Sequence, residues 1–170
     1  MPQEQFTHAA QEAIQSGQSM AATAGHAEFA PMHLLAALAA DARGPAASIL
    51  GRAGIDPSRV RQVAEAELKR MPTVTGASPR PAAQLGQAVQ EAQRLAKSMQ
   101  DEYTSAEHLL LALATAAGTA KSALQALGAD ERKLRKAIEE IRAASGVKNV
   151  NDPNAENTME ALKKYGIDLT

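Results

Sequence analysis

A repeated segment constrains the fold of this chain more than any other feature of its sequence. The letters "HLLAAL" at residues 33–38 return as "HLLLAL" at 108–113, and "ILGRAGID" at 49–56 returns as "ALQALGAD" at 123–130. In both copies an apolar stripe precedes the first segment and a helix of mixed charge follows the second. Four elements that recur in the same order predict two similar halves, each built from four short helices.

The apolar stripe that opens each half has the 4-3-4-3 spacing of one helix face. In the first half it consists of Phe6, Ala10, Ala13, Gly17 and Met20. Adding 79 to each number gives the stripe of the second half, which consists of Leu85, Val89, Ala92, Ala96 and Met99. The spacing therefore predicts that the two opening helices are equivalent in this register.

Residues that favour helix ends fix the expected boundaries. Asp56 and Asp130 suit the N-cap position, where a side-chain oxygen accepts from a free backbone amide. The segment "TSAE" predicts a capping box in which Thr104 and Glu107 each bond the other's backbone amide. With these signals we expect helices at 4–24, 31–41, 45–53, 57–71, 82–99, 105–116, 119–127 and 131–143.

The two halves are joined by a segment that cannot hold a helix. "PTVTGASPRP" at 72–81 contains three prolines, so we interpret it as a connector between repeats at about 1–71 and 82–143. We expect an all-α domain over 1–144, with the repeats packed about a pseudo-twofold axis. Residues 145–170 are polar at first and then begin a short helical pattern, which predicts a flexible linker leading towards a further module.

The charge balance and the composition exclude several classes of protein. The chain has 18 basic and 19 acidic residues, so it offers no basic face for nucleic acid and no charge that would favour an anionic membrane. It has no cysteine, which excludes disulfides and thiolate sites. The N-terminus lacks a signal-peptide pattern, and no apolar run approaches the ~18 residues of a membrane span. We therefore expect a soluble, cytoplasmic, helical protein.

No arrangement of residues in the sequence predicts catalysis, a cofactor or a metal site. There is no phosphate-binding loop, no nucleophile motif and no pair of histidines at metal-ligand spacing, so a small hydrolase is disfavoured. His33 and His108 are repeat equivalents and are interpreted as structural residues at helix starts. Asp101 and Glu107 are near each other in sequence, and the simplest interpretation is a solvated aspartate and a capping glutamate. The helix "ERKLRKAIEEIR" is interpreted as a solvated face with a Glu131–Arg135 pair.

A doubled four-helix unit with "EHLLLAL" in its second half resembles the N-terminal domains of Clp ATPases. The segments "FTHAAQEAI" and "GHAEFAPMHLL" and the tail "VNDPNAENTMEALKKYGIDLT" resemble the ClpB type, the protein disaggregases. The resemblance implies a domain that engages exposed hydrophobic segments of unfolded or aggregated proteins. It also implies a homohexameric parent that uses ATP and Mg²⁺ in other modules and works with the DnaK chaperone system, whereas the isolated domain would be a monomer without cofactor.

The resemblance further implies which residues handle substrate. By match to the family's motifs these are Thr7, Asp101 and Glu107, although capping remains an equal interpretation for Glu107. The apolar groove of the family would place Val89, Leu95 and His108 in its wall, whereas helical spacing alone makes such residues core. A role as an adaptor-docking domain of a protease-coupled Clp unfoldase remains the alternative function.

Overall fold

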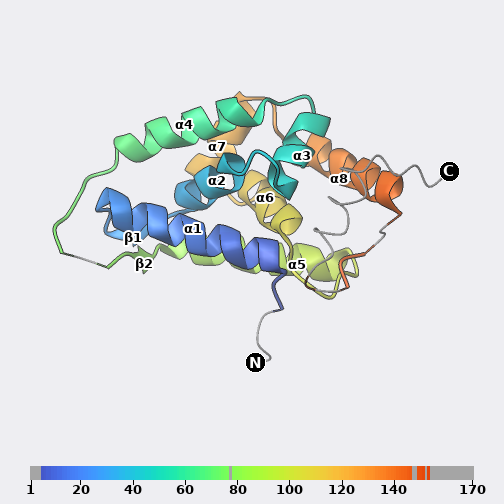
Figure 1. Ribbon diagram of the computed structural model, residues 1–170, viewed down its shortest axis with the longest axis horizontal. Coiled ribbons are helices and arrows are strands. Elements are labelled where there is room, and N and C mark those ends of the chain that lie inside the picture. The colour runs from blue at the N-terminus through green and yellow to red at the C-terminus, as the bar shows by residue number, and fades with distance from the viewer. Residues whose placement is uncertain (1–4, 77, 147–148, 152, 154–170) are drawn as a thin grey trace.

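The computed structural model describes residues 5–76, 78–146, 149–151 and 153, and in them the chain forms eight helices and one pair of very short strands (Figure 1). The first half contains α1 His8–Ala24, β1 Glu28–Phe29, α2 Pro31–Ala40, α3 Pro45–Arg52 and α4 Pro57–Lys69. The second half contains β2 Arg80–Pro81, α5 Ala83–Ser98, α6 Ala106–Thr115, α7 Thr119–Ala126 and α8 Glu131–Ser145. The all-α fold and the order of the helices agree with the sequence prediction.

Two of the predicted N-caps are present, whereas the start of α1 and the cap of α6 differ from the prediction. Asp56 accepts from the Ser58 amide at 2.9 Å and Asp130 from the Lys133 amide at 2.9 Å, as expected. The first helix does not begin at residue 4, because Thr7 has an extended conformation and accepts from the Ala10 amide at 3.2 Å. That hydrogen bond makes Thr7 the N-cap and starts the helix at the next residue.

The two halves are interlocked by parallel backbone pairing at the starts of their helices. Phe6 bridges Thr104, and in the same way Pro81 of β2 pairs with Phe29 of β1. Each pairing is reproduced by the other after a shift of 75 residues, the shift that relates His33 to His108. The segment before the first helix of each half therefore pairs with the segment before the second helix of the other, as a twofold arrangement requires.

This shift corrects the register predicted for the opening helices. The buried positions of α1 are Ala10, Ala13, Gly17 and Ala21, whereas those of α5 are Leu85, Ala88, Ala92, Leu95 and Ala96. A shift of 75 rather than 79 brings these faces into correspondence. The predicted register was wrong by one helical turn, because a stripe of 4-3 spacing nearly repeats itself after a slip of four residues.

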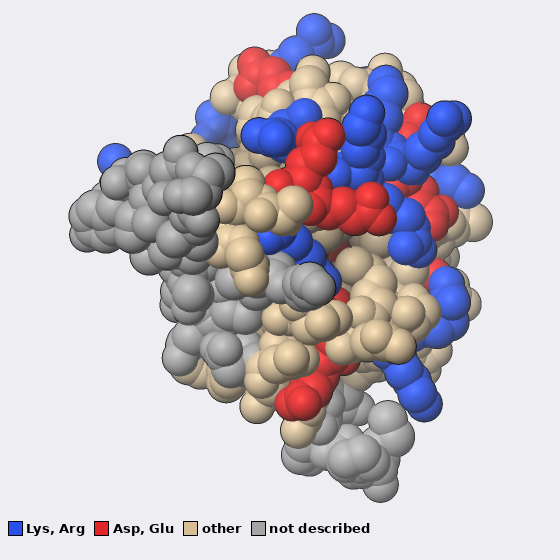
Figure 2. Space-filling model, turned by 90° about the vertical axis from the view of Figure 1, so that its right-hand side faces the viewer, with Lys and Arg blue, Asp and Glu red and all other residues tan. Residues whose placement is uncertain are grey.

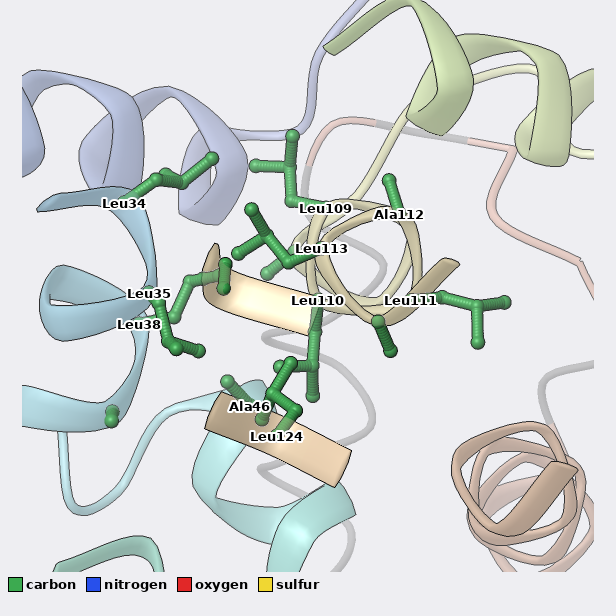
Figure 3. Packing of buried hydrophobic residues seen from close by; sticks show 14 of the residues in the cluster. Leu34, Leu35, Leu38, Ala46, Leu109, Leu110, Leu111, Ala112, Leu113 and Leu124 are labelled. Carbon is green, nitrogen blue, oxygen red and sulfur yellow. The ribbon is translucent and has the colours of Figure 1, made fainter. Parts of the chain in front are cut away.

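The core is centred on α6, which is buried on all sides. The five consecutive residues from Leu109 to Leu113 are each at most 2% exposed. Figure 3 shows their side chains leaving α6 in different directions, some towards Leu34 and Leu35 of α2 and others towards Leu124 of α7. A helix that is apolar all round must be covered by neighbours, and the alanine-rich faces of the surrounding helices allow a close approach.

The end of the molecule beside α8 is charged but carries both signs. Figure 2 shows basic and acidic side chains interspersed there. Arg135 pairs with Glu131 at 2.7 Å, as predicted, and Arg52 of α3 pairs with Glu140 of α8 at 3.0 Å. Across the described part of the chain, no single helix is long and apolar enough to cross a membrane; α6 and α7 meet that criterion only together, and they join at a 91° bend.

Gly17 of α1 should be a position where the ring of Phe29 leaves no room for a side chain. A Cβ there would lie 2.7 Å from Cε1 of Phe29, so Gly17→Ala must displace a buried ring and should lower the free energy of unfolding by about 1–3 kcal/mol. Gly86→Ala is the matched control, because nothing lies within 4 Å of its added Cβ; the better helix propensity of alanine should stabilise it by about 0.5–1 kcal/mol. The free energy of unfolding of both variants is measured by urea denaturation. A change in the same direction for both would contradict this packing.

Candidate functional site

A cluster of polar side chains is buried in the second half, between α6, α8 and the loop that precedes α6. We define the polar cluster as Asp101, Ser105, Glu107, His108 and Arg142, each of which is at most 8% exposed. Asp101 comes from the loop, Arg142 from the last turn of α8, and the other three from the start of α6. Charged side chains are rarely buried unless they are paired, so the partners of each define what the site is.

Arg142 lies between the two carboxylates. Its Nη2 is 2.9 Å from Asp101 Oδ2 and 2.7 Å from Glu107 Oε1, and its Nη1 is 3.2 Å from Asp101 Oδ1. Burial alone would lower the pKa of Arg142, but the charge of Glu107 and the hydrogen bonds to both carboxylates raise it above its usual value. The guanidinium therefore stays charged and joins α8 to the start of α6.

Asp101 accepts hydrogen bonds on both carboxylate oxygens. Oδ2 receives His108 Nε2 at 2.7 Å as well as Arg142, while Oδ1 receives the backbone amide of Val150 at 2.9 Å and the Asn149 side-chain amide at 3.2 Å. Burial alone would raise the pKa of Asp101, but the bonds from His108, Arg142 and Val150 lower it well below its usual range. The expectation of a solvated aspartate was wrong.

The capping box predicted for the start of α6 was assigned to the wrong residues. Ser105 is the N-cap, and its backbone amide donates to Nδ1 of His108 at 2.8 Å. Since Nδ1 accepts this bond, Nε2 carries the proton that is donated to Asp101. Thr104 instead takes part in the pairing between halves, because its amide donates to the Gln5 carbonyl at 2.7 Å. Glu107 binds Arg142 rather than a backbone amide of the cap.

Two residues of the predicted linker are docked on the domain. We define the exit segment as Asn149 and Val150; its Val150 is fully buried, and α8 continues to Ser145 before it. A little further on, the Pro153 carbonyl accepts from the His8 amide at 3.0 Å. The prediction of a flexible linker was therefore wrong for the exit segment. Residues 147–148, 152 and 154–170 of the predicted linker lie outside the described residues.

The first half has a counterpart of the polar cluster that consists of two histidines. His26 stands where the second half has Asp101, and its Nδ1 is 2.8 Å from Nε2 of His33. Nδ1 of His33 accepts from the Ala30 amide at 2.9 Å, as Nδ1 of His108 does from Ser105. Burial and the neighbouring His26 lower the pKa of His33 to about 4. Both repeat histidines are thus structural residues at helix starts, as expected.

The six residues predicted to handle substrate occupy very different positions. Asp101, Glu107 and His108 meet in the polar cluster, and Thr7, which caps α1, donates its backbone amide to the Thr104 carbonyl at 3.0 Å. Leu95 is core, 1% exposed, whereas Val89 is half-buried on α5 and packs on the core from outside. Direct contact between these residues and a substrate remains a prediction, and Val89 is the most accessible of the six.

Arg142 is the main residue that the sequence reasoning missed. It continues the buried positions of Leu134 and Ile138 at a spacing of four, so a basic residue stands on the apolar face of its helix. That mismatch is a readable signal for a buried ion pair. Within the described residues, no group of three or more histidine, cysteine, aspartate or glutamate side chains is placed to hold a metal ion.

Comparison with known proteins gives a consistent family match. The sequence matches the family described as "Clp repeat (R) N-terminal domain" over residues 5–117. It is 36% identical over 168 residues to the chaperone protein ClpB of Rhodopirellula baltica. The aligned region covers 98% of this chain and 19% of that protein. The chain therefore spans about a fifth of the length of this curated relative.

Two solved structures share the fold. The Hsp104 N-terminal domain from Candida albicans has a TM-score of 0.77 at 22% identity, with 90% of this chain and 99% of that chain covered. A structure described as a complex of the ClpV N-domain with a VipB peptide has a TM-score of 0.67 at 18% identity, with 87% and 91% covered.

Removing the cation from the polar cluster should destabilise the domain severely. Arg142→Met keeps the apolar stem but leaves two buried carboxylates without their partner, so we expect a loss of about 3–5 kcal/mol in the free energy of unfolding. The control is Arg52→Met, which breaks the exposed pair with Glu140 and should cost at most about 1 kcal/mol. Equal losses in urea denaturation would contradict the importance of the buried pair.

The buried histidine pair should make the domain sensitive to mild acid. Because the folded-state pKa of His33 is about 4, below its ordinary 6.5, the unfolded chain takes up a proton first as the pH falls. The stabilisation is fully present above pH 6.5 and is lost between pH 6.5 and about 4, by up to roughly 3 kcal/mol. His8→Ala, at an exposed histidine, should retain this slope and His33→Asn should reduce it; a flat profile of wild-type stability from pH 7 to 5 would refute the assignment.

Proposed function

The chain belongs to the Clp N-terminal domain family, and from that premise we propose that it is the substrate-engaging N-terminal domain of a ClpB-type protein disaggregase. The observation that carries the proposal is the similarity to ClpB across 98% of this chain, which includes the tail as well as the helical repeats. In this function the domain binds exposed hydrophobic segments of unfolded or aggregated polypeptides and delivers them to the motor for threading.

The proposed action is physical binding rather than chemistry. An unfolded polypeptide exposes apolar side chains, and a partly exposed apolar position such as Val89 can cover a few of them. Each contact contributes roughly 1–2 kcal/mol before the cost of ordering the polypeptide, so the affinity of one domain is weak and tolerant of sequence. Weak sites gain strength when several are tethered together, because linkage raises their effective concentration.

The remaining expectations concern the longer protein of which such a domain is part. We propose that ATP and Mg²⁺ are bound by other modules and that this chain contributes no catalytic residue of its own. The assembly would be a homohexamer that cooperates with the DnaK system in the cytoplasm, without nucleic-acid or membrane partners. The isolated domain would remain a monomer.

A second candidate function is the docking of one defined partner, such as the adaptor of a protease-coupled Clp unfoldase. It is favoured by the structural likeness to a ClpV N-domain that was solved with a VipB peptide. Such a domain would bind one folded or peptide partner tightly at one place and would ignore unfolded chains in general.

Nuclear magnetic resonance of the ¹⁵N-labelled chain would test the two functions. Adding a permanently unfolded protein, such as reduced and carboxymethylated α-lactalbumin, should shift a limited set of amide signals with a Kd in the range of about 10 µM to 1 mM. Val89→Asp should weaken this binding several-fold, and Gln90→Asp, at an exposed neighbour on the same helix, is the matched charge control. The absence of any shift at high concentration would reject the first function, and tight binding of a folded adaptor alone would establish the second.

A further inference from the structure

The exit segment is held by the kind of contacts that recognise an extended polypeptide. The carbonyl of Val150 accepts from the amides of Glu102 at 3.0 Å and Tyr103 at 3.1 Å, and its own amide donates to Asp101 at 2.9 Å. Its side chain is fully buried against Tyr103 and Ile141, in a small cluster separate from the main core. These contacts bind a backbone and one small apolar side chain, features that many sequences share.

The preceding residue adds a polar anchor. The Asn149 side-chain amide donates to the carbonyls of Met99 at 3.0 Å and Gln100 at 3.2 Å, as well as to Asp101. Gln100 has a φ of 62°, in the left-handed region that its first-half counterpart Gly25 also occupies, at 75°. A glutamine in the left-handed region is strained by the order of 1 kcal/mol. The surrounding contacts therefore hold the loop in this conformation, in which the carbonyls of Met99 and Gln100 accept from Asn149.

The first half shows what is special about this arrangement. There the segment after α4 returns to the same loop position, and the amide of Val74 donates to the carbonyl of Gly25 at 2.7 Å. That segment continues into β2 and is fixed by pairing at both ends, and Val74 itself remains 44% exposed. In the second half Asn149 takes the position of Val74, the next residue Val150 is buried, and the loop carries the buried carboxylate of Asp101.

We propose that the loop of residues 99–103 together with Ile141, the exit site, is a reversible binding site for extended polypeptides that carry a small branched apolar side chain. The chain's own exit segment occupies this site as an internal ligand. The inference deepens the proposed function, on which it rests, by naming a site and the feature that it selects. An internal ligand has an effective concentration in the millimolar range, so a weak external polypeptide gains access only when the exit segment leaves.

The test is to supply the internal ligand from outside. Val150→Asp would place a carboxylate in the apolar cluster beside Asp101 and should release the exit segment, so the amides of Glu102 and Tyr103 should lose hydrogen-exchange protection while those of α6 keep theirs. A synthetic peptide "SGVKNVNDP", which has the sequence of residues 145–153, should then shift the signals of Asp101, Glu102, Tyr103 and Ile141. The control peptide "SGVKNDNDP" should bind at least about tenfold more weakly, and so should the first peptide on the wild-type chain.

Equal binding of the first peptide to wild type and variant, or no binding to the variant, would overturn the proposal. If Val150→Asp does not fold, Val150→Ala, which only shortens the buried side chain, should show the same effect to a smaller degree. Binding of an unfolded protein at Val89 without peptide binding at the exit site would remove this inference alone. Peptide binding at the exit site of the variant, with unfolded proteins ignored by both chains, would instead remove the proposed function.

Discussion

The second half of the domain depends on one guanidinium placed between two carboxylates. A buried charge without partners costs several kcal/mol, and Arg142 relieves that cost for Asp101 and Glu107 at once. The pairing ties the last turn of α8 to the first turn of α6 and to the loop before it. Because Arg142 and His108 hold the Asp101 carboxylate in place, its second oxygen can receive the amide of Val150. The contact that stabilises the half therefore also determines where the chain leaves the domain.

The two halves share the same hydrogen bond at the start of their second helix, but the group that the histidine bonds through Nε2 differs. In both, a histidine three residues after the N-cap accepts the N-cap amide through Nδ1 and bonds a buried partner through Nε2. The partner is the imidazole of His26 in one half and the carboxylate of Asp101 in the other, and the carboxylate in turn pairs with Arg142. The shared part is what the fold needs, since it fixes the start of the helix that fills the core. The charged part is extra, and it lies beside the exit segment, where we propose the binding site.

Periodicity and caps sufficed to predict the fold, because amphipathic stripes, apolar runs and capping residues leave strong local signals. The same signals could not fix the register between repeats, since one turn of slip leaves an alanine-rich stripe almost unchanged; the pairing of Phe6 with Thr104 decides it. Nor could they decide between two adjacent hydroxyls, Thr104 and Ser105, for the cap of α6. Arg142 was readable as a charge on an apolar face. The docking of Asn149 was not, because its partners are carbonyl groups of a loop that have no side-chain signature.

Burial separates two ways in which a residue can affect substrate binding. Asp101 and Glu107 have side chains at most 3% exposed, and their oxygens are engaged by His108, Arg142 and the exit segment. A polypeptide outside the domain does not reach them while those contacts persist. Replacing either residue would first alter the loop before α6 and the docking of Val150. Any effect on a bound polypeptide would follow from those changes. In the function that we propose they are therefore positioning residues while Val150 is docked, and Asp101 is open to a substrate only after Val150 leaves. In the same proposal, direct contact with substrate falls to half-buried positions such as Val89.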